Sequence, residues 1–202
     1  MPPHELNQPE ARPRLRVVPG GGASSADREL DFDGLFRRYS PYVASIGLRL
    51  LGRDDELDDL VQDVFLEAHR GLSRVRELDS VKGWLARICV RRAVRRLRRR
   101  RLRAFLSLDT LKHDERLIAP GASPEVRVEV TRLYRKLELV PALDRAVWVL
   151  RYLEGEALGE IATLCGCSKS TVQRRLRAIE ARLDPSAELG PRLVTSIREG
   201  KP

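Results

Sequence analysis

The sequence is poor in the residue types that stabilise secreted proteins, span membranes or stack on bases. Its 202 residues include three cysteines, and aromatic residues make up 5%. Three cysteines form no disulfide framework, so we expect a reducing compartment such as the cytoplasm. So few aromatics argue against large stacking platforms for single strands. No apolar run approaches the about 20 residues that a membrane helix needs, and no secretory signal is visible, so we expect no membrane insertion.

Potential metal ligands are equally scarce. The histidines are His4, His69 and His113, and none lies near a carboxylate pair with metal-ligand spacing. Cys165 and Cys167 are the one close cysteine pair, and a buried, inert Cys165 beside a turn Cys167 is favoured over a metal site. No glycine-rich phosphate loop is present. We therefore expect no cofactor or metal, and an enzyme acting on nucleic acid is the weakest hypothesis.

Positive charge is what the chain has in excess. Lysine and arginine number 38 against 29 aspartate and glutamate residues, which gives a net charge of +9. A polyanion is the expected partner of such a chain.

Composition and helical periodicity divide the chain into five segments. Residues 1–28 are rich in Pro, Gly and Ser and predict a disordered tail. Residues 29–104 predict a helical domain, 105–124 a linker, 125–184 a helix-turn-helix domain and 185–202 a second tail. The predicted fold is all-α, with two small helical domains joined by a flexible linker, and such domains should move relative to each other.

The first domain combines an acidic helix with a basic one. Apolar residues recur from Phe32 to Leu50, where Pro41 is expected to kink or restart the helix. Residues 54–72 form a second helix whose apolar stripe leaves many carboxylates outside. Carboxylates near Asp55 suit a helix N-terminus, but those further along suggest a protein partner with a basic surface. These are Asp58, Asp59, Asp63 and Glu67.

The third helix is predicted from Val81 onward and is densely cationic. Like charges at i, i+4 spacing destabilise an isolated helix, so this run implies an anionic partner and salt-dependent binding. A basic disordered or targeting run is the weaker interpretation, because Trp84, Ile88, Val94 and Leu97 continue an apolar pattern beside it. The candidate DNA-binding residues are Arg87, Arg91, Arg92, Arg95, Arg98 and Arg99.

Residues 158–183 predict a helix, a tight turn and a second helix. Gly166 suits the left-handed conformation that ends a helix, and Ser168 can cap the next helix. That helix has an apolar stripe from Val172 to Leu183 and a basic, amide-bearing opposite face, which suits the DNA major groove better than an ordinary solvated hairpin. The candidate DNA-binding residues here are Lys169, Ser170, Thr171, Gln173, Arg174 and Arg177.

The order of these motifs resembles the extracytoplasmic-function group of the sigma-70 family of RNA polymerase sigma factors. The resemblance covers about residues 31–183 and rests on three segments. They are ELDDLVQDVFLEAHRGL (56–72), VKGWLARICVRRAVRRLRRR (81–100) and LELVPALDRAVWVLRYLEGEALGEIATLCGCSKSTVQRRLRAIEARL (137–183).

The resemblance implies a role for each segment. In this family the acidic helix docks on the clamp helices of the largest polymerase subunit, which points here to Asp58, Asp59, Gln62 and Asp63, with Phe65 in the core. The connection at 73–80 and the basic helix would meet the promoter minus-ten element, where an unpaired base is held in a pocket. The helix-turn-helix would read the minus-thirty-five element as duplex. An anti-sigma factor is a further implied partner.

Three positions depart from the family pattern. The basic helix usually carries an Asn and, four residues later, an Asp, where this chain has Arg91 and Arg95. These cations indicate either a different minus-ten sequence or stronger and less selective phosphate contact. Arg174 stands where a small residue is common. The competing hypothesis is a stand-alone helix-turn-helix regulator, which would have no use for the acidic face.

Overall fold

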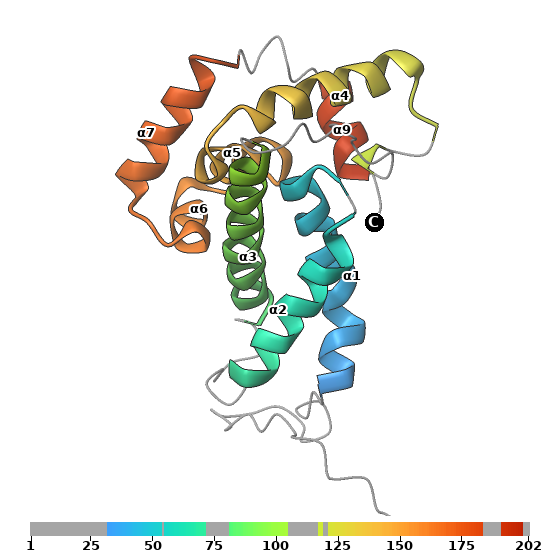
Figure 1. Ribbon diagram of the computed structural model, residues 1–202, viewed down its shortest axis with the longest axis vertical. Helices are drawn as coiled ribbons and strands as arrows, with labels where there is room; N and C mark the ends of the chain where they lie inside the picture. The colour runs from blue at the N-terminus through green and yellow to red at the C-terminus, as the bar shows by residue number, and fades with distance from the viewer. Residues whose placement is uncertain are drawn as a thin grey trace, which may run out of the picture.

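The structure is a computed structural model that describes residues 32–53, 55–71, 81–104, 117–118, 121–183 and 191–199. The predicted all-α fold is confirmed, and these residues contain no strand. The expected N-terminal tail and the connection at 73–80 lie outside the described residues. The helices are α1 (Phe32–Leu51), α2 (Leu57–Gly71), α3 (Val81–Ala104), α4 (Pro124–Glu138), α5 (Ala142–Trp148), the π-helix η5 (Val149–Leu153), α6 (Leu158–Cys165), α7 (Lys169–Glu180) and α9 (Pro191–Glu199) (Figure 1). None of these helices is long and apolar enough to cross a bilayer.

Helices α1, α2 and α3 pack against one another as a three-helix unit. Each buries the apolar stripe that its sequence predicts, including Val43 of α1, Leu60 of α2 and Leu85 of α3, all fully buried. Helix α1 runs without a break through Pro41, so the proline does not restart the helix.

Helices α4 to α7 form the second unit. Ser123 caps α4, whose first residue is Pro124, as expected of a residue that lacks an N–H. After Pro141 the chain forms α5 and continues directly into η5. Periodicity alone did not distinguish this π-helical turn from an α-helix.

The two units share one continuous hydrophobic core. Helix α3 stands in the middle, with α1 and α2 on one side and α5 and α6 on the other (Figure 1). At the end of the expected linker, Leu117 and Ile118 are buried in this core. The domains that the sequence predicts are therefore packed together in the structure.

The C-terminal segment 185–202, expected to be a tail, contains helix α9. This helix packs against α4 and η5, and Ser196 and Ile197 are buried there. The prediction of a tail is wrong for residues 191–199, because even a nine-residue helix can bury an apolar face against neighbouring helices.

Candidate nucleic-acid and partner interfaces

The acidic helix α2 presents its polar side chains in two directions. Asp58, Asp59 and Gln62 are exposed to solvent. Asp63 instead faces α3, where Arg96 Nη2 lies 2.6 Å from its Oδ2 atom. The helical repeat of 3.6 residues places Asp58 and Gln62 one turn apart on one face, and Asp59 and Asp63 one turn apart on the neighbouring face. The contact with Arg96 is therefore what distinguishes Asp63 from Asp59. Three of the four predicted polymerase-binding residues therefore lie on an open face, and the fourth is paired within the chain.

Further carboxylates of this segment pair with arginines of α3. Glu67 accepts hydrogen bonds from Arg91 and from Arg92, whose Nη2 atom lies 2.7 Å from Glu67 Oε2. Glu56 Oε1 lies 3.6 Å from Arg100 Nη2, and Arg100 Nη1 donates to the Leu51 carbonyl at 3.0 Å. Two of the predicted DNA-binding arginines, Arg91 and Arg92, thus help to hold α3 against the acidic segment. The sequence signal for this pairing is the spacing of Glu56, Asp63 and Glu67, which are seven and four residues apart. This spacing places the three carboxylates on one face of the helix.

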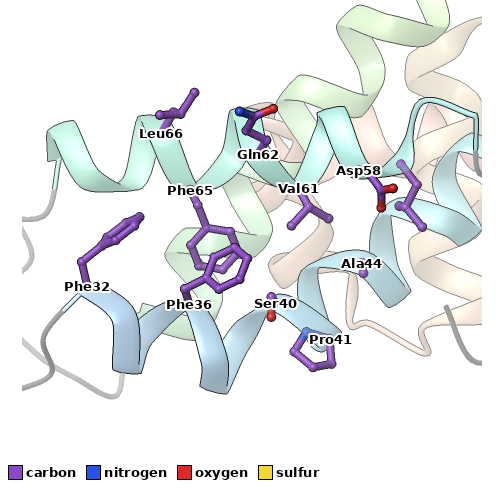
Figure 2. A pocket seen from close by; sticks show the side chains of 11 residues that line it. Phe32, Phe36, Ser40, Pro41, Ala44, Asp58, Val61, Gln62, Phe65 and Leu66 are labelled. Atoms are coloured by element: carbon purple, nitrogen blue, oxygen red, sulfur yellow. The ribbon is translucent and has the colours of Figure 1, made fainter.

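An apolar groove of about 570 Å³ lies between α1 and α2 (Figure 2). The rings of Phe36 and Phe65 meet edge to face with their centroids 4.8 Å apart. Phe36 is 42% exposed and Leu66 is 49% exposed, which is unusual for side chains of this size. Asp58 and Gln62 also line the groove. Sequence analysis missed it, although Leu66, a large apolar residue outside the buried stripe of α2, was a signal. Phe65 is buried, as predicted.

Arginines on one side of α3 form a stripe that faces the second unit. Arg87, Arg91, Arg95 and Arg98 are exposed and line one wall of a cavity of about 320 Å³. The opposite wall comes from α5, α6 and the turn after α6, and consists of Leu143, Leu164, Cys165 and Gly166. Arg99 is exposed as well. The basic stripe and the helix-turn-helix therefore meet across this cavity.

The helix-turn-helix has the local geometry that its sequence predicts. Gly166 is left-handed, with φ 64° and ψ 40°, and ends α6. The Ser168 hydroxyl accepts a hydrogen bond from the Thr171 N–H at 3.2 Å and caps α7. Val172 and Ile179 are buried on the inner face of α7. These predictions are confirmed, and the two caps determine where α6 ends and where α7 begins.

The outer face of α7 carries the predicted DNA-contacting side chains. Lys169, Ser170, Gln173, Arg174 and Arg177 are exposed, and Thr171 is half-buried. One cation, Arg175, is used internally, because it donates to Asp144 of α5. The exposed set offers the donors and acceptors that suit phosphates and base edges in the major groove.

The thiols of Cys89 and Cys165 are protonated at neutral pH. Burial raises the pKa of Cys165 to about 12, and burial likewise raises the pKa of Cys89 to about 12. A thiolate is the form that binds metal. No group of three or more His, Cys, Asp or Glu residues that could hold a metal ion occurs among the residues that the structure describes.

Comparison with known families matches both units. Residues 35–103 match the family Sigma-70 region 2, and residues 131–183 match Sigma-70, region 4. The chain belongs to the extracytoplasmic-function sigma factors of the sigma-70 family, and it directs promoter-specific transcription initiation. Residues 35–103 are called region 2 below, and 131–183 region 4.

Two curated sigma factors are similar to this chain over most of its length. The chain is 30% identical over 153 residues to the ECF RNA polymerase sigma factor SigM of Mycobacterium tuberculosis H37Rv, covering 75% of this chain and 74% of the relative. It is 31% identical over 160 residues to the ECF RNA polymerase sigma-E factor of Escherichia coli K12, covering 74% and 83%.

Two solved structures have a similar fold. One is the sigma factor RpoE of Bartonella quintana in complex with the anti-sigma factor NepR, with a TM-score of 0.56, 20% identity and coverage of 78% of this chain and 97% of that chain. The other is CnrH in complex with the cytosolic domain of CnrY, with a TM-score of 0.50, 23% identity and coverage of 78% and 87%.

Proposed function

We propose that this sigma factor docks on core RNA polymerase through the α1–α2 groove and its polar rim. The observation that carries the proposal is an apolar groove with Phe36 and Leu66 exposed and Asp58 on its lining. Such a groove accepts one face of an amphipathic helix, and the rim carboxylates select a partner with a basic flank. The clamp helices of the largest polymerase subunit, which the family resemblance implies, are a partner of this kind.

The promoter contacts are assigned to the exposed basic faces of α7 and α3. We assign reading of the minus-thirty-five duplex to α7, through Gln173, Arg174 and their exposed neighbours. The arginine stripe of α3 is assigned to the minus-ten element. Arg92 is removed from the predicted contact set, because it is half-buried and held by Glu67. Arg91 also donates to Glu67 but is exposed on the stripe, and it is kept. The protein has no catalytic role of its own in this proposal and acts in the cytoplasm.

An anti-sigma factor is the third partner of the proposal. Both similar structures are described as complexes of a sigma factor with an anti-sigma partner, NepR in one and CnrY in the other. In this chain the α1–α2 groove is the surface that such a partner would block, because a covered groove cannot accept the polymerase.

Charge reversal on the open face of α2 tests the docking surface. The double variant Asp58→Lys, Asp59→Lys should weaken binding to core polymerase by about tenfold, which corresponds to about 1.4 kcal/mol. Loss of rim attraction lowers the association rate most. Binding is measured by fluorescence anisotropy with labelled sigma factor, and DNA affinity of the free protein is measured in parallel.

The matched control is Glu129→Lys on α4, which changes an exposed carboxylate away from the groove. Circular dichroism establishes that each variant is folded. Unchanged polymerase binding by the folded double variant contradicts the docking assignment. Tight operator binding by the free wild-type protein, with no polymerase binding at all, would identify a stand-alone regulator instead.

A further inference from the structure

Regions 2 and 4 are joined by buried polar contacts as well as by the shared core. The Tyr134 hydroxyl of α4 donates to the Arg49 carbonyl of α1 at 3.0 Å. Within region 4, Arg145 of α5 is buried against the same tyrosine, with its guanidinium 5.5 Å from the centroid of the Tyr134 ring. Arg49 Nε lies 3.4 Å from Glu154 Oε1, at the end of η5. A buried charged group needs such partners, because an uncompensated charge is costly inside a protein. These contacts therefore favour this one arrangement of the two regions.

In this packed arrangement the two DNA-binding surfaces lie too close together to contact both elements of one promoter. The minus-ten and minus-thirty-five elements are about 25 base pairs apart, which at about 3.4 Å per base pair is on the order of 85 Å of duplex. In the structure α3 contacts α6 directly (Figure 1), and the arginine stripe of α3 faces the helix-turn-helix across one cavity. The two assigned DNA-binding surfaces cannot reach both elements of one duplex until the regions separate.

Helix α9 connects the two regions and lies outside both family matches. Its Arg198 donates from Nε to the Leu153 carbonyl of region 4 at 2.7 Å. The carbonyl of the same Arg198 accepts a hydrogen bond from Arg49 Nη2 of region 2 at 3.1 Å. Ile197 is buried beside these contacts. One residue of α9 thus bonds to region 2 and to region 4 at the same time.

We propose that α9 is an intramolecular clasp that holds regions 2 and 4 in a closed conformation and thereby limits access of DNA to the α3 arginine stripe. The clasp lowers the population of the open conformation, and the apparent DNA affinity of the free protein falls by the same fraction. Releasing α9, or separating the regions on polymerase, makes the stripe available. The claim that α9 holds the two regions together stands by itself. The claim that α9 limits access of DNA rests on the DNA contacts assigned under the proposed function.

The first test measures the shape of the full-length protein in solution. Small-angle X-ray scattering is compared between wild type, Arg198→Ala and Ile197→Asp. Arg198→Ala removes the bond to Leu153, and Ile197→Asp places a charge in an apolar site, which undocks α9. Both variants should show a larger radius of gyration than wild type. Thr195→Ala, on the exposed face of α9, is the matched control and should not change it.

The second test measures binding of the same proteins to a labelled promoter fragment without polymerase. Arg198→Ala should bind about fivefold more tightly than wild type, and Ile197→Asp up to about thirtyfold more tightly. Circular dichroism establishes that helix content is retained, and if Ile197→Asp fails to fold, Arg198→Ala decides.

An unchanged radius of gyration in folded Arg198→Ala overturns the clasp. A larger radius without tighter DNA binding overturns the claim that the clasp limits access to DNA. Neither result bears on whether the protein binds core polymerase, so the proposed function is judged separately by the charge-reversal experiment.

Discussion

At the scale of single residues, Gly52 shows how closely regions 2 and 4 approach each other. Its φ of 71° is left-handed, and its N–H donates to the Leu48 carbonyl at 2.7 Å to end α1. A Cβ atom at this position would lie 2.5 Å from Tyr134 Cδ1 and 2.7 Å from Arg145 Nη2. Burial lowers the pKa of Arg145 to about 10, so its guanidinium remains charged at neutral pH. Only glycine leaves room for this charged side chain and for the ring.

We predict that Gly52→Ala lowers the free energy of unfolding by at least about 2 kcal/mol. The left-handed backbone alone costs about 1–2 kcal/mol for a residue with a Cβ atom, and the contacts with region 4 add to that. Urea denaturation measures the change. The matched control is Gly83→Ala in α3, where a Cβ atom meets nothing within 4 Å, and a stabilisation of about 0.5–1 kcal/mol is expected there. Equal effects of the two substitutions would contradict the proposed crowding at Gly52.

At the scale of elements, α7 divides its cations between packing and recognition. Arg175 bonds to Asp144 and fixes α7 against α5. The hydroxyl of Tyr152 donates to Glu180 at the C-terminal end of the helix. Arg174 and Arg177 are exposed on the outer face. A recognition helix that is held at its middle and at its C-terminal end presents its outer side chains in a defined orientation, which direct readout of bases requires.

Replacing Arg174 by alanine should change the preferred minus-thirty-five sequence. A bidentate contact of arginine with a base contributes about 1–3 kcal/mol of discrimination, so the preference at one base pair should weaken correspondingly. Selection from a random promoter library with core polymerase measures the preference. Arg182→Ala, an exposed cation just beyond the helix, should leave it unchanged. An identical preference with uniformly weaker binding would make Arg174 a phosphate contact.

At the scale of the whole molecule, the half-buried carboxylate of Glu154 lies where the two regions meet, beside Arg49. Burial raises the pKa of Glu154, and the neighbouring Glu156 raises it further; Arg49, Arg198 and Lys82 act in the opposite direction without cancelling the effect of burial. The folded protein therefore holds a proton on Glu154 at pH values where the unfolded chain, with a pKa near 4.5, has lost it.

This shift predicts that stability decreases with pH in a defined window. The folded state binds the proton of Glu154 more tightly than the unfolded chain does. The contribution of Glu154 to the free energy of unfolding therefore falls as pH rises from about 4.5 to the raised pKa, and it is constant above that pKa. Urea unfolding at a series of pH values measures the slope. Glu154→Gln should flatten the dependence of the free energy of unfolding on pH in this window. Glu129→Gln, which replaces an exposed carboxylate, should not. A slope that is the same in both variants would refute the assignment to Glu154.

Much of the local structure could be predicted because it depends on neighbours in sequence. The helix-turn-helix geometry follows from Gly166 and Ser168, whose roles in ending α6 and capping α7 are local. The buried stripe of α2 follows from helical periodicity. Arg145 is the counterexample, because nothing in the α5 sequence around it indicates that its charge is buried against Tyr134 of α4.

Only those features of the candidate site that depend on neighbours in sequence could be predicted. Periodicity places Asp59 and Asp63 on α2, but it does not say that Asp63 meets Arg96 while Asp59 remains open. The α1–α2 groove was not anticipated, since it arises where two helices diverge around Phe36 and Phe65.

The sequence by itself determined the helical periods of regions 2 and 4, the caps at Gly166 and Ser168, the charge of each face and the family of sigma factors to which the chain belongs. Spacing along the chain decides which face of a helix a residue occupies, and short-range hydrogen bonds decide where a helix ends. Only the tertiary structure decided which faces meet: that α3 turns its arginine stripe toward α6, and that α9 bonds to both regions through Arg198. These contacts join residues 45 to 149 positions apart, and their geometry depends on the relative orientation of whole helices.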